Sequence, residues 1–388
     1  MEHLINPNVR KIQISGIRKF ANLVAQHQNV ISLTIGQPDF PTPQHVKERA
    51  KTAIDENRTG YTENAGLLDA RKAACQFLSI KYGLSYDPKS EVIITNGATE
   101  AIDIALRTVL APGAEVILPG PVYPGYEPVI RLCGAIPVFV DTRADGFKLR
   151  AEAIEQALTE HTRCVILPYP SNPTGTTLSY SELESIANVL QNRNVFVISD
   201  EIYSELVYDG SHVSIASFPS MREKTIVING LSKSHSMTGW RIGLTFAPEY
   251  ITRHMLKVHQ YSATCASSIS QHAALEAFEG GVEDAVAMKV EYVQRRDYVF
   301  ERLQRMGFDG IKPSGAFYLF PSIRPFAENS FDFAAQLLEK AKVAVVPGAA
   351  FSEYGEGYIR ISYAYSMETL KEGMDRIEYF LHGNQTIE

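Results

Sequence analysis

The stretch TIVINGLSKSHSMTGWRIGLTF, residues 225–246, places two apolar runs on either side of a loop of small and hydroxyl residues. The runs Thr225–Ile228 and Ile242–Phe246 have the composition of strands that are buried on both faces of a sheet. The loop carries Lys233 and, further on, Arg241. A lone lysine is usually a solvated surface charge, but α/β proteins bind ligands beyond the ends of buried strands. Lys233 is therefore a candidate functional residue.

Five more apolar runs precede this stretch, with helical patterns between several of them. The runs are Val92–Thr95, Val116–Pro119, Pro137–Val140, Val165–Leu167 and Val195–Ser199. Helical patterns mark Thr99–Leu110 and Ser179–Leu190. Strands that alternate with helices predict an α/β architecture with a mostly parallel sheet.

The C-terminal part of the chain has a different pattern. A long helical pattern, three strand candidates and a closing helix follow one another at Val282–Met306, Ala316–Phe320, Val343–Val346, Tyr358–Tyr363 and Met367–Leu381. This order predicts a second, smaller α+β lobe. We predict a large domain at 48–285 and a discontinuous small domain at 1–47 and 286–388, with a ligand-binding cleft between them.

Composition and charge limit the classes of function. The chain has 388 residues, and 37 Lys and Arg against 44 Asp and Glu give a net charge of −7. This balance argues against nucleic acid or an anionic membrane as a partner. The four cysteines are scattered without a CxxC pair, so we expect reduced thiols and no metal site. Because we find no signal core and no membrane-spanning apolar run, we expect a cytoplasmic protein.

The segment Asn96-Gly97-Ala98-Thr99 joins a strand to a helix. A glycine turn at a helix N-terminus leaves backbone N–H groups free to bind an anion. An ordinary turn with Thr99 near the helix cap is the alternative. The segment matches neither a Walker loop nor the GxGxxG pattern, so we expect no nucleotide.

Polar residues follow two other strand candidates, and an arginine lies on a third. Asn172, in PYPSNPTG, and Asp200, with Tyr203 just beyond it, come after apolar runs. Asp200 could cap a helix, or it could accept a hydrogen bond from a cationic heterocycle. Arg360, in YIRISY, lies on a strand candidate and could face solvent or hold a carboxylate with its planar fork.

Taken in order along the chain, these features resemble the class I aminotransferases, which are fold type I pyridoxal-phosphate enzymes. The strings SNPTG, SDEIYSEL and SKSHSMTGWRIG carry the resemblance, which extends from LTIGQPD at 33–39 to Arg360. It implies a large domain with a mostly parallel seven-stranded sheet and a smaller α+β domain.

The resemblance also implies roles for the residues around the cofactor ring. Lys233 binds the cofactor as a Schiff base and later moves a proton at the substrate α-carbon. Asp200 pairs with the pyridine nitrogen. Tyr203 and Asn172 hydrogen-bond the phenolic oxygen of the ring, and Tyr123, in GPVYPGY, stacks on the ring face.

For the phosphate, the resemblance implies a cradle at the turn and a counter-charge. The predicted residues are Gly97, Ala98, Thr99, Arg241 and, from a neighbouring subunit, Tyr61 in GYTENAG. Tyr61 therefore predicts a homodimer with active sites at the subunit interface. Gly230 stands where the family often has serine, and Ser232 could supply the hydroxyl instead.

For the substrate, the resemblance implies that Arg360, Asn172 and Gly36 bind the α-carboxylate. The segments 15–27 and 257–271 are similar to those of N-acetyl-diaminopimelate aminotransferases of lysine biosynthesis, which use glutamate and 2-oxoglutarate as the other pair. Related bacterial aspartate aminotransferases carry lysine where Thr99 stands. Aspartate and aromatic aminotransferases remain alternatives, as does a carbon–sulfur β-lyase that shares Lys233, Asp200 and Arg360.

Overall fold

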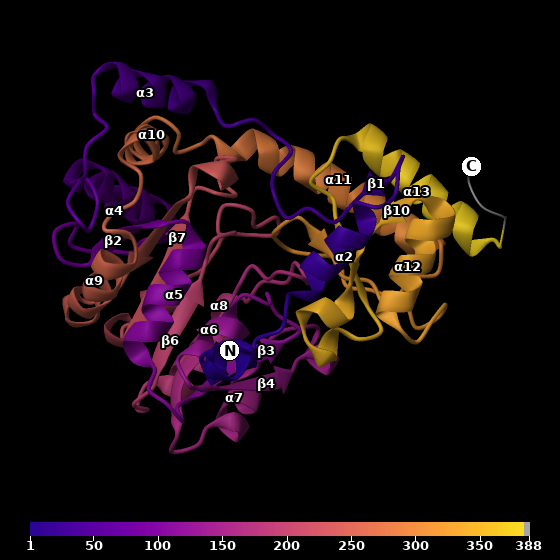
Figure 1. Ribbon diagram of the computed structural model, residues 1–388, viewed down its shortest axis with the longest axis horizontal. Coiled ribbons are helices and arrows are strands. Elements are labelled where there is room, and N and C mark those ends of the chain that lie inside the picture. Colours follow the sequence, from indigo (N-terminus) through magenta and orange to yellow (C-terminus); the bar gives the residue numbers. More distant parts are fainter. Residues whose placement is uncertain (384–388) are drawn as a thin grey trace.

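A seven-stranded sheet forms the centre of the computed structural model, which describes residues 1–383 (Figure 1). The strands are β2 (Val92–Asn96), β3 (Glu115–Gly120), β4 (Ile136–Asp141), β5 (Thr162–Leu167), β6 (Phe196–Asp200), β7 (Thr225–Gly230) and β8 (Ile242–Phe246). Their order is β2-β8-β7-β6-β5-β3-β4, and only β8 runs antiparallel to its neighbours. All seven apolar runs became strands, which confirms the predicted α/β sheet.

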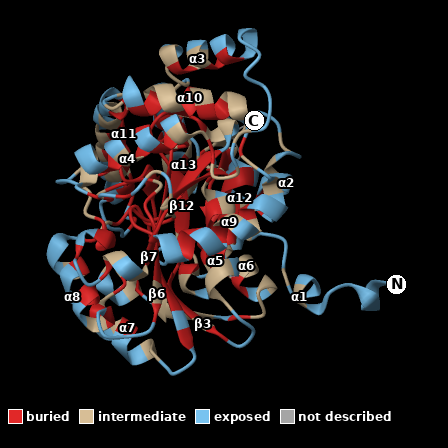
Figure 2. Cartoon of the chain, turned by 90° about the vertical axis from the view of Figure 1, so that its left-hand side faces the viewer, coloured by how far each residue is buried: buried red, intermediate tan, exposed pale blue. Residues whose placement is uncertain are grey.

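Helices cover both faces of this sheet because alternate strand side chains point to opposite sides. On one face, α5 (Ala98–Val109), α6 (Tyr126–Leu132) and α9 (Glu249–Ala263) pack on strand side chains that include Ile226 and Ile228. On the other face lie α3 (Gln44–Asp55), α4 (Leu68–Tyr82), α7 (Ala151–Ala157), α8 (Tyr180–Leu190) and α10 (Ser268–Glu279). Figure 2 shows the strands buried and the outer helix faces exposed.

Helix α8 illustrates how the sequence sets these boundaries. Ser179 is its N-cap and accepts a hydrogen bond from the Glu182 backbone, while the Glu182 carboxylate accepts one from the Ser179 backbone. This capping box satisfies two backbone donors that the helix leaves free. The predicted helix at Ser179–Leu190 is therefore confirmed.

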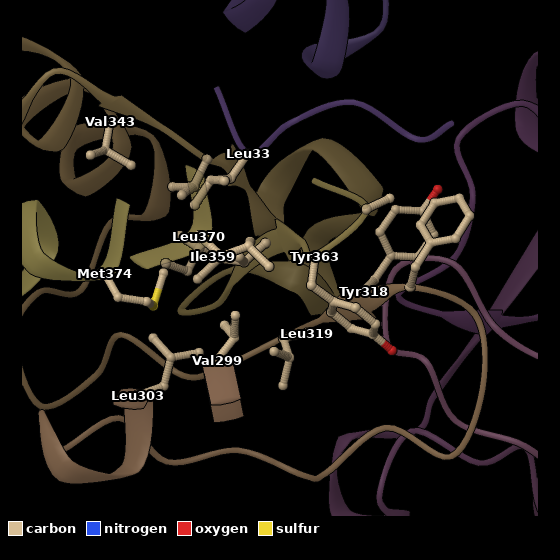
Figure 3. Close-up of a cluster of buried hydrophobic side chains, with 14 of the residues drawn as sticks. Leu33, Val299, Leu303, Tyr318, Leu319, Val343, Ile359, Tyr363, Leu370 and Met374 are labelled. Carbon is tan, nitrogen blue, oxygen red and sulfur yellow. The ribbon is translucent and has the colours of Figure 1, made fainter. Parts of the chain in front are cut away.

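A smaller lobe packs beside the sheet. It contains α11 (Ala285–Arg305), α12 (Ser330–Ala341), α13 (Met367–Leu381) and the strands β1 (Ile31–Ser32), β9 (Tyr318–Leu319), β10 (Val343–Ala344), β11 (Val346–Pro347) and β12 (Ile359–Ser362). Figure 3 shows part of its core, a cluster of buried side chains to which Leu33, Val299 and Leu370 all belong. The two ends of the chain thus share one core, although the domain boundaries given above stay a prediction.

One predicted strand of this lobe was wrong. Val343–Val346 is not a single strand but two, and the two pair with different partners. β10 is parallel to β1, whereas β11 is antiparallel to β12, which in turn pairs with β9. An apolar run of this length reads as one strand in the sequence, because nothing local marks the change of partner.

The remaining elements are short. They are α1 (Pro7–Arg10), α2 (Gly16–Val24) and 3₁₀ helices at Glu2–Leu4, Arg143–Asp145, Ile215–Ser217, Arg222–Lys224, Thr238–Trp240, Gly348–Phe351 and Glu353–Gly355. Within residues 1–383, none of the helices combines the length and the apolar character needed to cross a bilayer.

Candidate active site

A cavity of about 490 Å³ lies where the carboxyl ends of β5 and β6 face the small lobe. Its lining includes eleven of the residues predicted from the sequence: Gly36, Ala98, Thr99, Tyr123, Asn172, Asp200, Tyr203, Ser232, Lys233, Arg241 and Arg360. Cavities of this size and mixed lining are typical of small-molecule sites. The predicted residues therefore meet in one place, although they span more than 300 positions of the chain.

Lys233 is one of three basic side chains that line this cavity. Its Nζ donates a hydrogen bond to the carbonyl oxygen of Gly36 at 2.6 Å. Burial, and then the positive charges of Arg360 and Arg241, lower the pKa of Lys233 to about 8, while Asp200 opposes the shift. A lysine with such a pKa is neutral part of the time near physiological pH, as a nucleophilic amine must be.

Asp200 ends β6 and is only 7% exposed. The Tyr126 hydroxyl donates to its Oδ2 at 2.6 Å, and the Ile202 backbone N–H donates to its Oδ1 at 3.2 Å. Burial raises the pKa of this carboxyl, and the bond from Tyr126 counteracts the rise. A buried carboxylate held by neutral donors is suited to a cationic partner inside the cavity.

The turn before α5 has the geometry of an anion cradle. Gly97 is the N-cap with φ of 79°, and among the described residues no side chain caps the first turn. The Arg241 guanidinium lies directly over the turn, since a Cβ on Gly97 would be 2.3 Å from its Nη2. Free N–H groups of Ala98 and Thr99 beside a guanidinium favour a phosphate-like group.

Arg360, on β12, lies across the cavity from this turn and is 3% exposed. Its Nη1 donates to Asn172 Oδ1 at 2.9 Å, and its Nη2 donates to the Thr34 carbonyl at 2.6 Å. Its Nε is buried without a hydrogen-bond partner among residues 1–383. A buried guanidinium with an unused donor is suited to a carboxylate ligand.

Comparison with known proteins identifies the family of this site. Residues 28–377 match the family described as aminotransferase class I and II. The chain belongs to the class I and II aminotransferases. It is 65% identical, over 98% of its length and 96% of the other chain, to a protein of Bacillus subtilis named probable N-acetyl-LL-diaminopimelate aminotransferase.

Solved structures of this aminotransferase family have the same fold. The aromatic aminotransferase of Pyrococcus horikoshii is 43% identical, with a TM-score of 0.89 over 94% of this chain and 99% of that one. The N-succinyldiaminopimelate aminotransferase of Mycobacterium tuberculosis is 31% identical, with a TM-score of 0.92 over 97% and 99%. The fold type I prediction is confirmed, and the chain is an aminotransferase.

Pyridoxal phosphate, the cofactor of this aminotransferase family, is chemically matched by three groups in the cavity. An amine with a pKa of about 8 suits its aldehyde, a buried carboxylate suits its protonated ring nitrogen, and the α5 turn with Arg241 suits its phosphate. The donor set therefore fits the cofactor.

One predicted residue lies outside the cavity lining, and one position departs from the family pattern. Tyr61 is 90% exposed and does not line the cavity. Gly230 has no room for a side chain, because a Cβ there would be 2.8 Å from the Ile242 carbonyl oxygen and 3.1 Å from Gly243 Cα. The close approach of β7 and β8 thus explains why this chain has glycine where the family often has serine.

The sequence reading missed several residues of the site. Tyr126, which donates to Asp200, was not singled out, because Tyr123 lies in the loop before α6 and no regular spacing links the two tyrosines. Glu100 accepts hydrogen bonds from the Asn96 backbone and side chain at 2.6 and 3.0 Å and pairs with His259 at 2.9 Å. No local pattern links His259, on α9, to this turn.

Proposed function

We propose that this aminotransferase uses pyridoxal phosphate bound to Lys233 to transfer an amino group from N-acetyl-LL-2,6-diaminopimelate to 2-oxoglutarate, or in reverse, in lysine biosynthesis. The substrate assignment rests on the 65% identity, along nearly the whole chain, to a relative that is named for N-acetyl-LL-diaminopimelate. The solved neighbour named for N-succinyldiaminopimelate, a compound of the same N-acylated class, supports it.

Residues of the large lobe would hold the cofactor ring. Lys233 would bind it covalently, and Asp200 would keep its ring nitrogen protonated. Tyr203 and Asn172 would donate hydrogen bonds to its phenolic oxygen, and Tyr123 would stack on its face. When bound, pyridoxal phosphate supplies an electron sink that stabilises negative charge at the substrate α-carbon.

The phosphate would rest on the N-terminus of α5. Gly97, Ala98 and Thr99 would contribute backbone N–H groups, Arg241 the positive charge, and Ser232 a hydroxyl. Because a Cβ at Gly97 would collide with the Arg241 guanidinium, glycine is what allows the charge to lie so close to the turn.

The substrate's α-carboxylate would bind Arg360, which Asn172 and the Thr34 carbonyl already orient. As a free amine, Lys233 would move a proton to and from the substrate α-carbon, acting as general base and then as general acid. Gly36 would accept a hydrogen bond from the ammonium form of Lys233, as it does in the structure.

The lining of the cavity differs at one position from that of the related aspartate aminotransferases. Its basic lining residues, among those described, are Lys233, Arg241 and Arg360, and each has a role above. Thr99 stands where a lysine would grip a short distal carboxylate. The lining also includes Ile17, Ala21 and Ile35, whose apolar side chains would suit the methylene chain of an acylated diaminopimelate.

We also propose a homodimer in which Tyr61 reaches the phosphate of the neighbouring subunit. Its side chain is almost fully exposed on the isolated chain, as is that of Tyr261. Large aromatic side chains so exposed are typical of interface residues. Light scattering of the purified protein would give two chains per particle, and a monomer at working concentration would contradict this proposal.

An assay with purified protein tests the substrate. N-acetyl-LL-2,6-diaminopimelate with 2-oxoglutarate should yield glutamate with a kcat/KM well above those for aspartate and for phenylalanine. A preference for either of these amino acids would contradict the proposed substrate but would still agree with the assignment as an aminotransferase. If the protein instead released pyruvate and ammonia from a sulfur-substituted cysteine without a keto-acid acceptor, it would be a carbon–sulfur β-lyase.

A further inference from the structure

Tyr318, the first residue of β9, lines the cavity from the side of the small lobe and is 1% exposed. No motif in the sequence singles it out. Its side chain nevertheless contacts both Tyr203, which would bind the cofactor's phenolic oxygen, and Arg360, which would bind the substrate carboxylate. These two roles rest on the proposed function.

The first contact joins two hydroxyl groups. Tyr318 Oη lies 2.7 Å from Tyr203 Oη, and both side chains are buried. One hydroxyl must donate to the other. If Tyr318 donates, the proton of Tyr203 is free to point into the cavity; if Tyr203 donates, that proton is already used.

The second contact favours one direction for this hydrogen bond. The guanidinium of Arg360 lies over the face of the Tyr318 ring, 4.4 Å from its centroid. Burial raises the pKa of the Tyr318 hydroxyl, and the Arg360 charge works against that rise. A cation at this distance makes a phenol more acidic and thus a better donor than acceptor. Lys233 Nζ also lies over the Tyr203 ring, but at the longer distance of 5.6 Å from its centroid, so the nearer cation favours Tyr318 as the donor to Tyr203.

The third contact fixes the ring in place. A Cβ on Gly36 would lie 2.5 Å from Tyr318 Oη, so the backbone that holds Lys233 Nζ passes directly over this hydroxyl. Only glycine permits that approach. Tyr318 is thus confined between the segment around Gly36 and the guanidinium of Arg360.

We propose that Tyr318 is a positioning residue that couples the two halves of the site. By donating to Tyr203, it directs the proton of Tyr203 toward the cofactor's phenolic oxygen. When a substrate carboxylate neutralises Arg360, Tyr318 becomes a weaker donor, and the hydrogen bond from Tyr203 to the cofactor weakens with it. Substrate binding at one end of the cavity thereby changes the hydrogen bond offered at the other. Linked hydrogen bonds of this kind strengthen or weaken together.

The test follows the visible absorbance of the protein loaded with pyridoxal phosphate as a function of pH. A donor to the phenolic oxygen favours the deprotonated form of the chromophore and lowers the pH midpoint. Tyr318→Phe keeps the ring under Arg360 and removes only the hydroxyl. We expect its midpoint to be higher than that of the wild type.

The coupling is read out with glutarate, a dicarboxylate that has no amino or keto group. Saturating glutarate should raise the midpoint of the wild type and raise that of Tyr318→Phe by less. We also expect kcat/KM to fall roughly tenfold in Tyr318→Phe, as for the loss of one buried hydrogen bond. Tyr318→Leu, which also removes the ring, should raise KM further.

Tyr363→Phe is the matched control, because Tyr363 is equally buried and its hydroxyl donates to the Ala316 carbonyl at 3.2 Å, outside the cavity lining. It should change thermal stability but not the midpoint. If Tyr318→Phe behaves like this control, with the wild-type midpoint and the full glutarate shift, Tyr318 has a structural role only. A wild type without visible absorbance would instead refute the proposed function.

Discussion

Lys233 Nζ lies 2.6 Å from the carbonyl oxygen of Gly36, so a lysine of the large-lobe sheet region is held by a backbone segment that leads out of the small lobe. The two residues are far apart in the sequence and meet only across the cavity. The amine lies in the site, where burial and then the charges of two arginines lower its pKa. The cavity therefore sets both the position of the Lys233 amine and its lowered pKa.

The pKa of Lys233 predicts how cofactor uptake depends on pH. Only the neutral amine attacks an aldehyde, so the uptake rate should rise with pH and level off above about 8, well below the ordinary lysine value of 10.5. Arg360→Gln removes one of the charges that depress this pKa, so its midpoint should move upward. Stopped-flow absorbance measures both, with Arg302→Gln as a control far from the cavity. A wild-type midpoint near 10.5 would refute the account.

Replacing Arg360 by lysine should separate substrate binding from cofactor binding. A point charge cannot replace the planar fork that bonds Asn172 and Thr34, so KM for the amino acid should rise roughly 10- to 100-fold. The Kd for pyridoxal phosphate should stay unchanged. Steady-state kinetics and absorbance titration test the two values, and weaker cofactor binding with an unchanged KM would show that the assigned role is wrong.

Tyr126→Phe should impair the reaction through Asp200. The change removes the 2.6 Å hydrogen bond to a buried carboxylate, which costs about 1–3 kcal/mol and so lowers kcat/KM roughly 10- to 100-fold. Because that bond opposes the rise in the Asp200 pKa, the pKa should increase further. Tyr86→Phe is the control, since the Tyr86 hydroxyl is buried without a partner among residues 1–383. Equal kinetics for the two variants would contradict the prediction.

Gly97→Ala should weaken phosphate binding specifically. The new Cβ would meet Arg241 Nη2 at 2.3 Å and would strain a backbone with φ of 79°. Gly83→Ala imposes similar strain at φ of 67° with no heavy atom within 4 Å, so it should lower stability by about 1 kcal/mol and leave cofactor affinity intact. Titration with pyridoxal phosphate distinguishes them; similar affinities would mean that the turn is not the phosphate site.

The sequence predicts the large lobe well because its strands are buried on both faces and separated by helices. Each of the seven runs carries its own signal, as in Thr225–Ile228. The run Val343–Val346 was wrongly predicted as one strand, because β10 and β11 are two residues each and depend on different tertiary partners.

The residues of the site also differ in whether a local motif or only a tertiary contact reveals them. Lys233, Asp200 and Arg360 could be found because each lies in a distinctive local motif. Tyr318 and the pair of Glu100 with His259 could not, because their importance arises from contacts between segments that only the fold brings together. Local patterns identify reactive groups more readily than the residues that orient them.

Borohydride reduction of the protein loaded with pyridoxal phosphate, followed by peptide mapping, tests the central claim most directly. The account predicts one reduced cofactor label per chain, attached to Lys233, and no label in Lys233→Ala even though that variant folds. A protein that stays colourless with excess pyridoxal phosphate, or a label on any other lysine, would contradict it.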